Sequence, residues 1–139
     1  MNLIAVSERY RVFIVAVNCK LRVYELDPHT ASIVSDQYQE IDLLNEDNLI
    51  NNIRLVTCAD REFIVTVDDG AYVRMVYLDD LTKDPIKFRN IYNHTNDNST
   101  WSVDGSSSSQ FGFPPRVAVG SNAHSMTVFN LSTGTSEQL

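Results

Sequence analysis

Residues 63–79 read FIVTVDDGAYVRMVYLD, and this stretch decides the fold. Two runs rich in β-branched and aromatic side chains flank Asp68-Asp69-Gly70, and Asp-Gly pairs are typical of tight hairpin turns. The run from Phe63 to Val67 is apolar almost without interruption, which is typical of a strand covered on both faces. The stretch therefore predicts an antiparallel hairpin inside a β-rich structure.

The same pattern recurs twice elsewhere in the chain. Val-aromatic pairs stand at 23/24, 76/77 and 128/129, at steps of 53 and 52 residues. Each copy has a polar turn inside the hairpin and a further apolar run ahead of it. A repeat of about 50 residues with several short strands is typical of β-propeller blades. The sequence therefore predicts an all-β fold of about three antiparallel blades of an incomplete β-propeller.

The blades are expected at about residues 1–36, 51–90 and 100–131, within one partial propeller domain over 1–139. We expect a fourth strand at Ser32–Ser35 in the first blade and at Ile86–Phe88 in the second, and we find no candidate after Leu131. The segments between them are predicted to be polar loops, with a short helix as the alternative for Gln39–Asn45. These loops cover 37–50, 90–100 and 104–112.

Three blades cannot close a ring, because propellers use about four to eight and depend on closure to protect their strand edges. We therefore expect a piece of a larger propeller, a truncated gene product, or a module that a partner completes. The outward faces of the first and last blades are expected to be apolar, and the middle strands to supply the core. The residues expected to be buried are Ile14, Val15, Val17, Ile64, Val65, Val67, Val117 and Val119.

The charge balance excludes several classes of partner. The 139 residues hold 11 Lys and Arg against 18 Asp and Glu, for a net charge of −7. Sequence-independent binding of nucleic acid needs clustered basic residues, and those of this chain are scattered, so we expect no direct nucleic-acid binding. No run approaches the roughly 20 apolar residues of a bilayer-spanning helix, and the first residues lack the layout of a signal peptide. We expect no membrane association and an intracellular location, nuclear or cytoplasmic.

The candidates for chemistry are few. Asp68-Asp69 beside Asp79-Asp80 could hold a hard cation through oxygen ligands, but the hydrogen bonding of an Asp-Gly turn explains the first pair better. The histidines stand in three different loops without ligand spacing; they are His29, His94 and His124. Cys19 and Cys58 could meet across blades, although two free, half-buried thiols suit an intracellular protein better. We predict no catalytic, cofactor-binding or metal-binding residue and no cofactor.

Trp101, which opens the third unit, has two interpretations. Exposed on a propeller rim it would be an interface anchor, but a strand that begins Trp-Ser-Val is expected to bury its first residue between blades. Ser106–Ser109 is either a phosphorylation site or a plain linker. Five arginines between acidic neighbours are interpreted as a solvated mixed surface; they are Arg54, Arg61, Arg74, Arg89 and Arg116.

Several segments resemble one known family. They are Asn51–Leu55, Phe63–Gly70, Trp101–Val103 and, most specifically, Val117–Phe129 with its Ser-Asn-Ala-His-Ser-Met-Thr-Val-Phe run. Over about residues 1–131 the chain resembles the fungal WD-repeat regulators of ribonucleotide reductase transcription, whose loss causes constitutive transcription. The resemblance implies WD-type blades, a structural role for Asp69, and a nuclear, non-enzymatic protein of the DNA-damage response linked to a cullin-type ubiquitin ligase.

Three classes of function follow. The first is a non-catalytic scaffold with protein partners, which the resemblance sharpens to a nuclear regulator with cullin-type ligase subunits among its partners. The second is a generic WD-repeat adaptor in another complex. The third, an enzyme built on a propeller, needs convergent polar groups around a central channel, and the sequence shows none.

Overall fold

The computed structural model describes residues 1–89, 99–106 and 114–139, of which the side chains of Phe88 and Arg89 are left aside. These residues form three four-stranded antiparallel sheets and no helix, which confirms the predicted all-β fold of three blades of an incomplete WD-type propeller. The strands are β1 (Ile4–Ser7), β2 (Val12–Val17), β3 (Lys20–Glu25), β4 (Gln39–Asp42), β5 (Ile50–Cys58), β6 (Arg61–Asp68), β7 (Tyr72–Tyr77), β8 (Ile86–Arg89), β9 (Thr100–Ser106), β10 (Arg116–Ser121), β11 (Met126–Asn130) and β12 (Ser136–Gln138). Within the described ranges, no segment forms a helix long and apolar enough to cross a bilayer.

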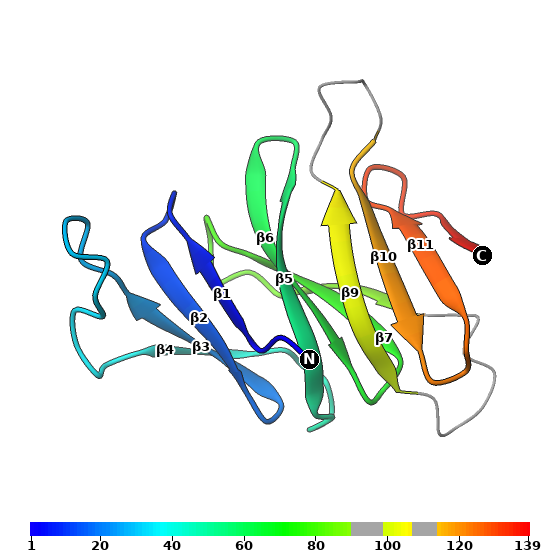
Figure 1. Ribbon diagram of the computed structural model, residues 1–139, viewed down its shortest axis with the longest axis horizontal. Coiled ribbons are helices and arrows are strands. Elements are labelled where there is room, and N and C mark those ends of the chain that lie inside the picture. Colours follow the sequence, from blue (N-terminus) through cyan, green and yellow to red (C-terminus); the bar gives the residue numbers. More distant parts are fainter. Residues whose placement is uncertain (90–98, 107–113) are drawn as a thin grey trace.

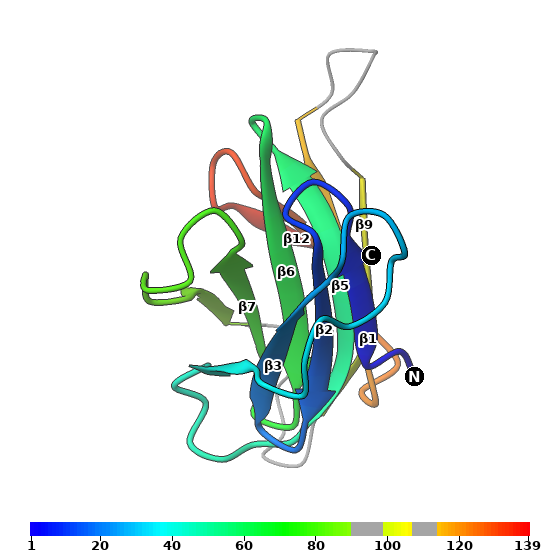
Figure 2. The ribbon, with the colours of Figure 1, turned by 90° about the vertical axis from the view of Figure 1, so that its left-hand side faces the viewer.

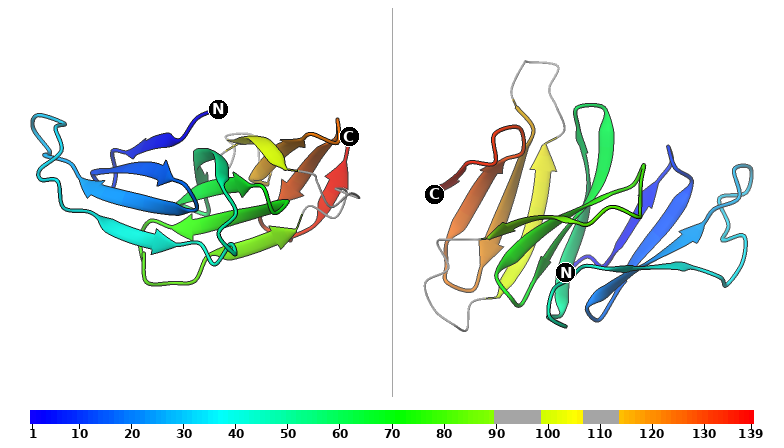
Figure 3. Two further views of the ribbon diagram at one scale, coloured as in Figure 1. Left: turned by 90° about the horizontal axis from the view of Figure 1, so that it is seen from below. Right: turned by 180° about the vertical axis from the view of Figure 1, so that it is seen from behind.

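The sheets stand side by side in chain order, from β1–β4 through β5–β8 to β9–β12 (Figure 1). In each sheet, strands that are neighbours in sequence pair with one another. Seen from below, β1, β5 and β9 lie along one side of the molecule and β4, β8 and β12 along the other (Figure 3, left). Because the three sheets share this orientation, we call the side of each that looks toward the next sheet its forward face, and the opposite side its backward face.

The middle sheet is covered on both faces. Every residue of β6 from Phe63 to Asp68 is buried. Ile64 and Val76 pack with the first sheet, and Val65 and Met75 pack with the third. A strand covered on both faces needs apolar residues at consecutive positions, which explains the uninterrupted run that the sequence shows here.

The first sheet is covered on its forward face alone. Ile14 and Ala16 of β2 are buried against the middle sheet, but Val15 and Val17 point the other way and are only half-buried. The prediction that Val15 and Val17 belong to the core is therefore wrong, because alternate residues of a strand face opposite sides and no sheet covers their side. The remaining predicted core residues are buried as expected.

The sequence repeat corresponds to the three sheets, but in the middle sheet the structurally equivalent residues are shifted by one position from those that the sequence pattern aligns. The sequence pattern aligns Ile14 with Ile64, yet Ile14 looks forward to the middle sheet and Ile64 looks backward to the first. Equivalent positions of blades related by rotation must look the same way, so Ile14 corresponds to Val65. The cause lies in the turns, because two residues connect Val17 to Lys20 whereas five connect Val67 to Val73, and a one-residue slip exchanges the two faces of a strand.

The fourth strands differ from the expected ones in two blades. In the first sheet the fourth strand is β4, over Gln39–Asp42, where a polar loop or short helix was predicted. Ser32–Ser35 forms no strand, and Ile33 makes only an isolated bridge to Leu26. The third sheet gains β12 beyond Leu131. Both strands are exposed along most of their length, so they carry little of the apolar alternation that marks a strand in sequence.

The other loop boundaries change less. Ile86–Phe88 lies within β8, as predicted. The predicted loop over 104–112 begins later, because β9 continues to Ser106 and pairs with Arg116. The loop expected over 90–100 overlaps β9 only at its last residue. Residues 90–98 and 107–113, which include His94 and most of the Ser106–Ser109 run, lie outside the described residues.

Candidate protein-interaction surface

One edge of the molecule gathers the three hairpin turns and the starts of β5 and β9; we call this edge the hairpin rim. It lies along the lower side in Figure 1. The turns are Asn18-Cys19, Asp69–Ala71 and Asn122–Ser125, and the loop over residues 43–49 leads from β4 into β5 at the same edge. Segments from all three sheets therefore meet along one side of the fold.

Hydrogen bonds between different sheets tie the hairpin rim together. The amide of Ile50 donates to the carbonyl of Asn18 at 2.8 Å, which links the middle sheet to the first turn. The Asn51 side chain donates both to Oδ1 of Asp69, at 2.8 Å, and to the carbonyl of Thr100, at 3.0 Å, where the third sheet begins. Asn51 is buried, so these bonds are shielded from water and hold the edges of two sheets in register.

Two further hydrogen bonds continue this row of bonds along the hairpin rim, and we call the whole row the belt. The Asn52 amide group donates to the carbonyl of Trp101 at 3.2 Å, and the backbone amide of Asn122 donates to the carbonyl of Ser99 at 3.2 Å. The belt thus reaches from the turn of the first sheet to the turn of the third. A rim held in this way presents its exposed side chains in fixed positions.

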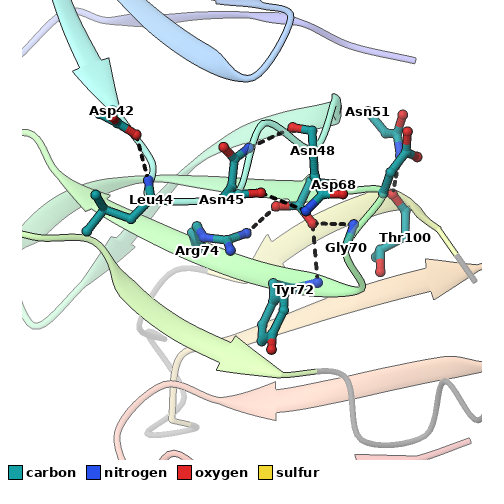
Figure 4. A network of polar contacts seen from close by, with 11 residues as sticks. Asp42, Leu44, Asn45, Asn48, Asn51, Asp68, Gly70, Tyr72, Arg74 and Thr100 are labelled. Carbon is teal, nitrogen blue, oxygen red and sulfur yellow. Dashed lines mark hydrogen bonds and ion pairs between the residues drawn. The ribbon is translucent and has the colours of Figure 1, made fainter. Parts of the chain in front are cut away.

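The loop over residues 43–49 is held by polar side chains of its own (Figure 4). Asp42 accepts a bond from the amide of Leu44 at 2.8 Å. Asn45 and Asn48 donate to each other's backbone carbonyls, at 2.7 and 2.6 Å, and Leu43 is buried beneath. These hydrogen bonds fix the backbone of the loop, and Leu44 is exposed on it.

A buried ion pair lies under the second turn (Figure 4). Asp68 is fully buried and Arg74 is 2% exposed, and Nη1 of Arg74 donates to Oδ2 of Asp68. The other carboxylate oxygen of Asp68 accepts bonds from the amides of Gly70, at 2.9 Å, and Tyr72, at 3.4 Å. Burial raises the pKa of Asp68, and the Arg74 cation opposes that rise. Arg74 was expected on a solvated surface, and its burial corrects that expectation; it keeps its charge inside the protein because Asp68 pairs with it.

Gly70 and Ala71 show what the second turn requires. A Cβ on Gly70 would lie 2.7 Å from the side-chain nitrogen of Asn48, so this glycine makes room for the neighbouring loop. The left-handed backbone of the turn falls instead on Ala71, with a φ of 62°. The Asp-Gly pair marks the turn in the sequence, as predicted, but its glycine serves close approach and not a positive φ.

The hairpin rim exposes large apolar side chains. Leu44 is 58% exposed, Leu49 51%, Trp101 46% and Met126 42%. Glu46, Asp47 and Asp69 are exposed beside them. Exposed aromatic and aliphatic side chains on a rigid support are the usual anchors of protein interfaces, so this surface is the candidate interaction site.

Trp101 was expected between blades, and its exposure corrects that expectation. Ser102 pairs with Gly120 and Thr100 pairs with Ser121, so Trp101 is an extra residue in a β-bulge of β9. A bulge breaks the inward and outward alternation of a strand. Thr100 is therefore the buried residue and the indole turns outward.

The carboxylate pairs of the sequence do not come together. Asp68 and Asp69 lie where β7 begins, whereas Asp79 follows its far end and forms a two-pronged ion pair with Arg61, at 2.7 Å from both nitrogens. The Arg61 hydrogen bond lowers the pKa of Asp79. No group of three or more His, Cys, Asp or Glu able to hold a metal occurs among the residues that the structure describes.

The cysteines also stay apart, as two half-buried free thiols. Cys19 lies in the first turn, where its thiol donates to Asp47 at 3.5 Å, and Cys58 lies at the far end of β5. Desolvation raises the pKa of both thiols, and for Cys19 the bond to Asp47 adds to the rise. Both thiols are thus held protonated, away from the reactive thiolate form. His29 and His124 are exposed in separate loops.

Three of the four exposed apolar side chains of the rim were not predicted from the sequence; they are Leu44, Leu49 and Met126. Leu44 and Leu49 stand in the run Leu43-Leu44-Asn45-Glu46-Asp47-Asn48-Leu49-Ile50, which was interpreted as a polar loop or short helix. A solvated loop does not require leucines, so the leucines on both sides of a very polar stretch could have indicated that this loop has a binding role. Met126 carries no such signal, because its exposure follows from its position at the start of β11.

No family model matches the chain, but comparison with known proteins shows a similarity. Over 131 residues, 94% of its length, the chain is 30% identical to a WD40 repeat-containing protein of Dictyostelium discoideum. The chain spans 17% of the length of that protein. Together with the three four-stranded sheets, this similarity supports a relationship to WD-repeat proteins.

Proposed function

We propose that the chain is a non-catalytic protein-interaction module that binds its partner through the hairpin rim. The observation that carries the proposal is the set of four exposed apolar side chains on a belt of hydrogen bonds between sheets. Such side chains lose little conformational freedom on binding, because their backbone is already fixed. The sequence similarity to a WD40 repeat protein supports the same role.

The side chains of the rim define the chemistry of the partner. Leu44, Leu49, Trp101 and Met126 favour a partner segment with apolar side chains. Glu46, Asp47 and Asp69 are exposed among them, and the whole chain has a net charge of −7. Acidic groups beside an apolar surface favour and orient basic groups on the partner. The expected ligand is a protein segment in which Lys or Arg flanks apolar residues.

The finer role that we propose is that of a nuclear regulator of ribonucleotide reductase transcription in the DNA-damage response, with cullin-type ubiquitin ligase subunits among its partners. Its support is the resemblance carried by Val117–Phe129 and the other matching segments. A net negative charge disfavours direct DNA contact, so regulation would pass through proteins. The alternative is a WD-repeat adaptor of another complex, nuclear or cytoplasmic. In either case we propose that residues 1–139 act as one partial propeller domain.

Quantitative affinity purification tests this proposal. The chain, its Trp101→Ala and Leu49→Ala variants and a Val34→Ala control are expressed with one tag and the retained proteins are compared. Val34 is 55% exposed but lies in the loop after β3, away from the hairpin rim. We expect both rim variants to lose the same partners and the control to keep them. Partners unaffected by the rim variants would contradict the rim, and partners without ligase or chromatin proteins would favour the alternative adaptor.

A further inference from the structure

The first and third sheets each leave one broad face uncovered, and the two faces differ. The backward face of the first sheet is apolar, with Ile4 49% and Val6 46% exposed beside half-buried Phe13, Val15 and Tyr24. Figure 2 looks from this side and shows β1, β2 and β3 in front of the middle sheet. The expectation of an apolar outward face is met here.

The forward face of the third sheet is made of smaller and more polar residues, against expectation. Its central strands present Ala118, Gly120 and Val128, all half-buried. Asp104, Arg116 and Glu137 stand toward its edges, where Arg116 and Glu137 pair at 3.9 Å. The two faces therefore are not alike, and the question is whether one fits the other.

The sizes of the side chains at equivalent positions indicate that the forward face of the third sheet fits the backward face of the first. Between the first and second sheets, Ile14 on the forward face and Ile64 on the backward face share one core; between the second and third, Val65 and Val117 share the other. With the one-residue slip of the middle sheet taken into account, Ala118 is the forward residue of the third sheet that is equivalent to Ile14 and Val65. Phe13 is the backward residue of the first sheet that is equivalent to Ile64 and Val117. The smallest forward residue thus corresponds to the largest backward one, which keeps the packed volume of the pair nearly constant.

In two further rows the forward residue of the third sheet is the smallest of its row or as small as another, and the backward residue of the first sheet is the largest or as large as another. Gly120 on the forward face corresponds to Val15 on the backward face, and Val128 corresponds to Tyr24. In the covered rows, Val67 and Val119 share the second core, as do Met75 and Phe129, and Val23 and Val76 share the first. Ala16 belongs to the first core, and Thr66, at the equivalent backward position, is buried. A forward face of small residues makes room for a backward face of large ones, so the two uncovered faces are complementary in shape.

We propose that two copies of this chain associate head to tail, the forward face of each third sheet packing on the backward face of the partner's first sheet, to form a closed ring of six sheets. Six lies within the range of about four to eight blades in which propellers close. Closure of the ring also doubles the surface area that the association buries. A face four strands wide and about five residues long covers roughly 300 Å², so one contact is small, whereas the two contacts of a ring bury about 1,200 Å², the lower end for stable interfaces.

Light scattering on the purified chain, coupled to size exclusion, tests the proposal over a range of concentrations. We expect twice the 15.7 kDa mass of the chain at high concentration and dissociation on dilution. Phe13→Ala should leave a void and Ala118→Phe should overpack, so each should shift the midpoint of association at least tenfold toward higher concentration. The double variant Phe13→Ala/Ala118→Phe exchanges the two sizes and should restore association.

The controls separate this contact from other ones. Trp101→Ala changes the hairpin rim and should leave the mass unchanged, so failure of partner binding at the rim and failure of the ring are distinguishable. Both altered residues lie on uncovered faces, and thermal melting followed by circular dichroism should show that the variants stay folded. A monomer at every concentration, open-ended growth beyond two copies, or a double variant no better than the single ones would each overturn the proposal.

Discussion

Replacing Arg74 with methionine would test the buried ion pair beneath the hairpin rim. The substitution keeps most of the side-chain volume but leaves the Asp68 carboxylate, which is fully buried, without its cation. Removing one partner of a buried pair costs about 3–5 kcal/mol. Because the amides of Gly70 and Tyr72 still donate to Asp68, we expect the lower end, about 3 kcal/mol of unfolding free energy.

The double variant Asp68→Asn/Arg74→Met is the control. It removes both charges, and the asparagine oxygen can still accept the bond from the Gly70 amide. Since replacing a whole buried pair by uncharged groups is often close to neutral, the double variant should lose clearly less stability than Arg74→Met alone. Urea denaturation followed by circular dichroism gives the unfolding free energy of each variant.

The dependence on pH adds a second check. Burial raises the pKa of Asp68 in the folded state, and without Arg74 only the amides of Gly70 and Tyr72 still oppose that rise. A folded-state pKa above the unfolded value makes the loss of stability greatest at high pH and relieves it as the pH falls through the folded-state pKa. Arg74→Met should therefore lie closer to the wild type at pH 5 than at pH 8. A loss below about 1 kcal/mol, a gap independent of pH, or a double variant as unstable as the single one would refute this reasoning.

Three further predictions concern the second turn and the far end of β7. Gly70→Ala should cost about 1–3 kcal/mol, because its Cβ would meet Asn48; an unchanged urea midpoint would contradict that contact. Ala71→Gly should raise the thermal midpoint, by up to about 1 kcal/mol in stability, since it relieves a positive φ; a lower midpoint would argue against the left-handed turn. Asp79→Asn should destabilise more at pH 7 than at pH 3, because Arg61 lowers the pKa of Asp79 and that stabilisation starts to be lost as the pH falls below about 4, the unfolded value, toward the lowered folded-state pKa; an equal effect at both values would contradict it.

The fold was largely predictable from the sequence because its strong signal is local. The apolar runs of β2, β6 and β10 and the polar turns after them mark each hairpin. β4 and β12 were missed because a mostly exposed outer strand is fixed by its neighbour and carries little pattern of its own. That Ile14 and Ile64 face opposite sides of their sheets could not be predicted either. The sequence of a turn does not show which residues of the two strands pair across it.

The candidate site was less predictable, because it depends on contacts between sheets. The outward turn of Trp101 comes from a bulge that exists only in the pairing of β9 with β10. Arg74 lies on the same face of β7 as Val76, which packs with the first sheet, and a charged residue in a strand gives no sign that it will be buried. Asp68 was recognisable as a turn residue, whereas its role as the partner of a buried cation was not.

Site-directed photo-crosslinking tests the central claim, that this chain works through protein contacts at its hairpin rim. A photoreactive amino acid is placed at Leu49 on the rim, or at Val34 on the far side as the matched control; both side chains are more than half exposed. We expect that, after irradiation in cells, position 49 becomes joined to one or a few defined proteins and position 34 does not. Crosslinks to the same proteins from position 34 but not from 49, or to nucleic acid from the rim, would contradict it.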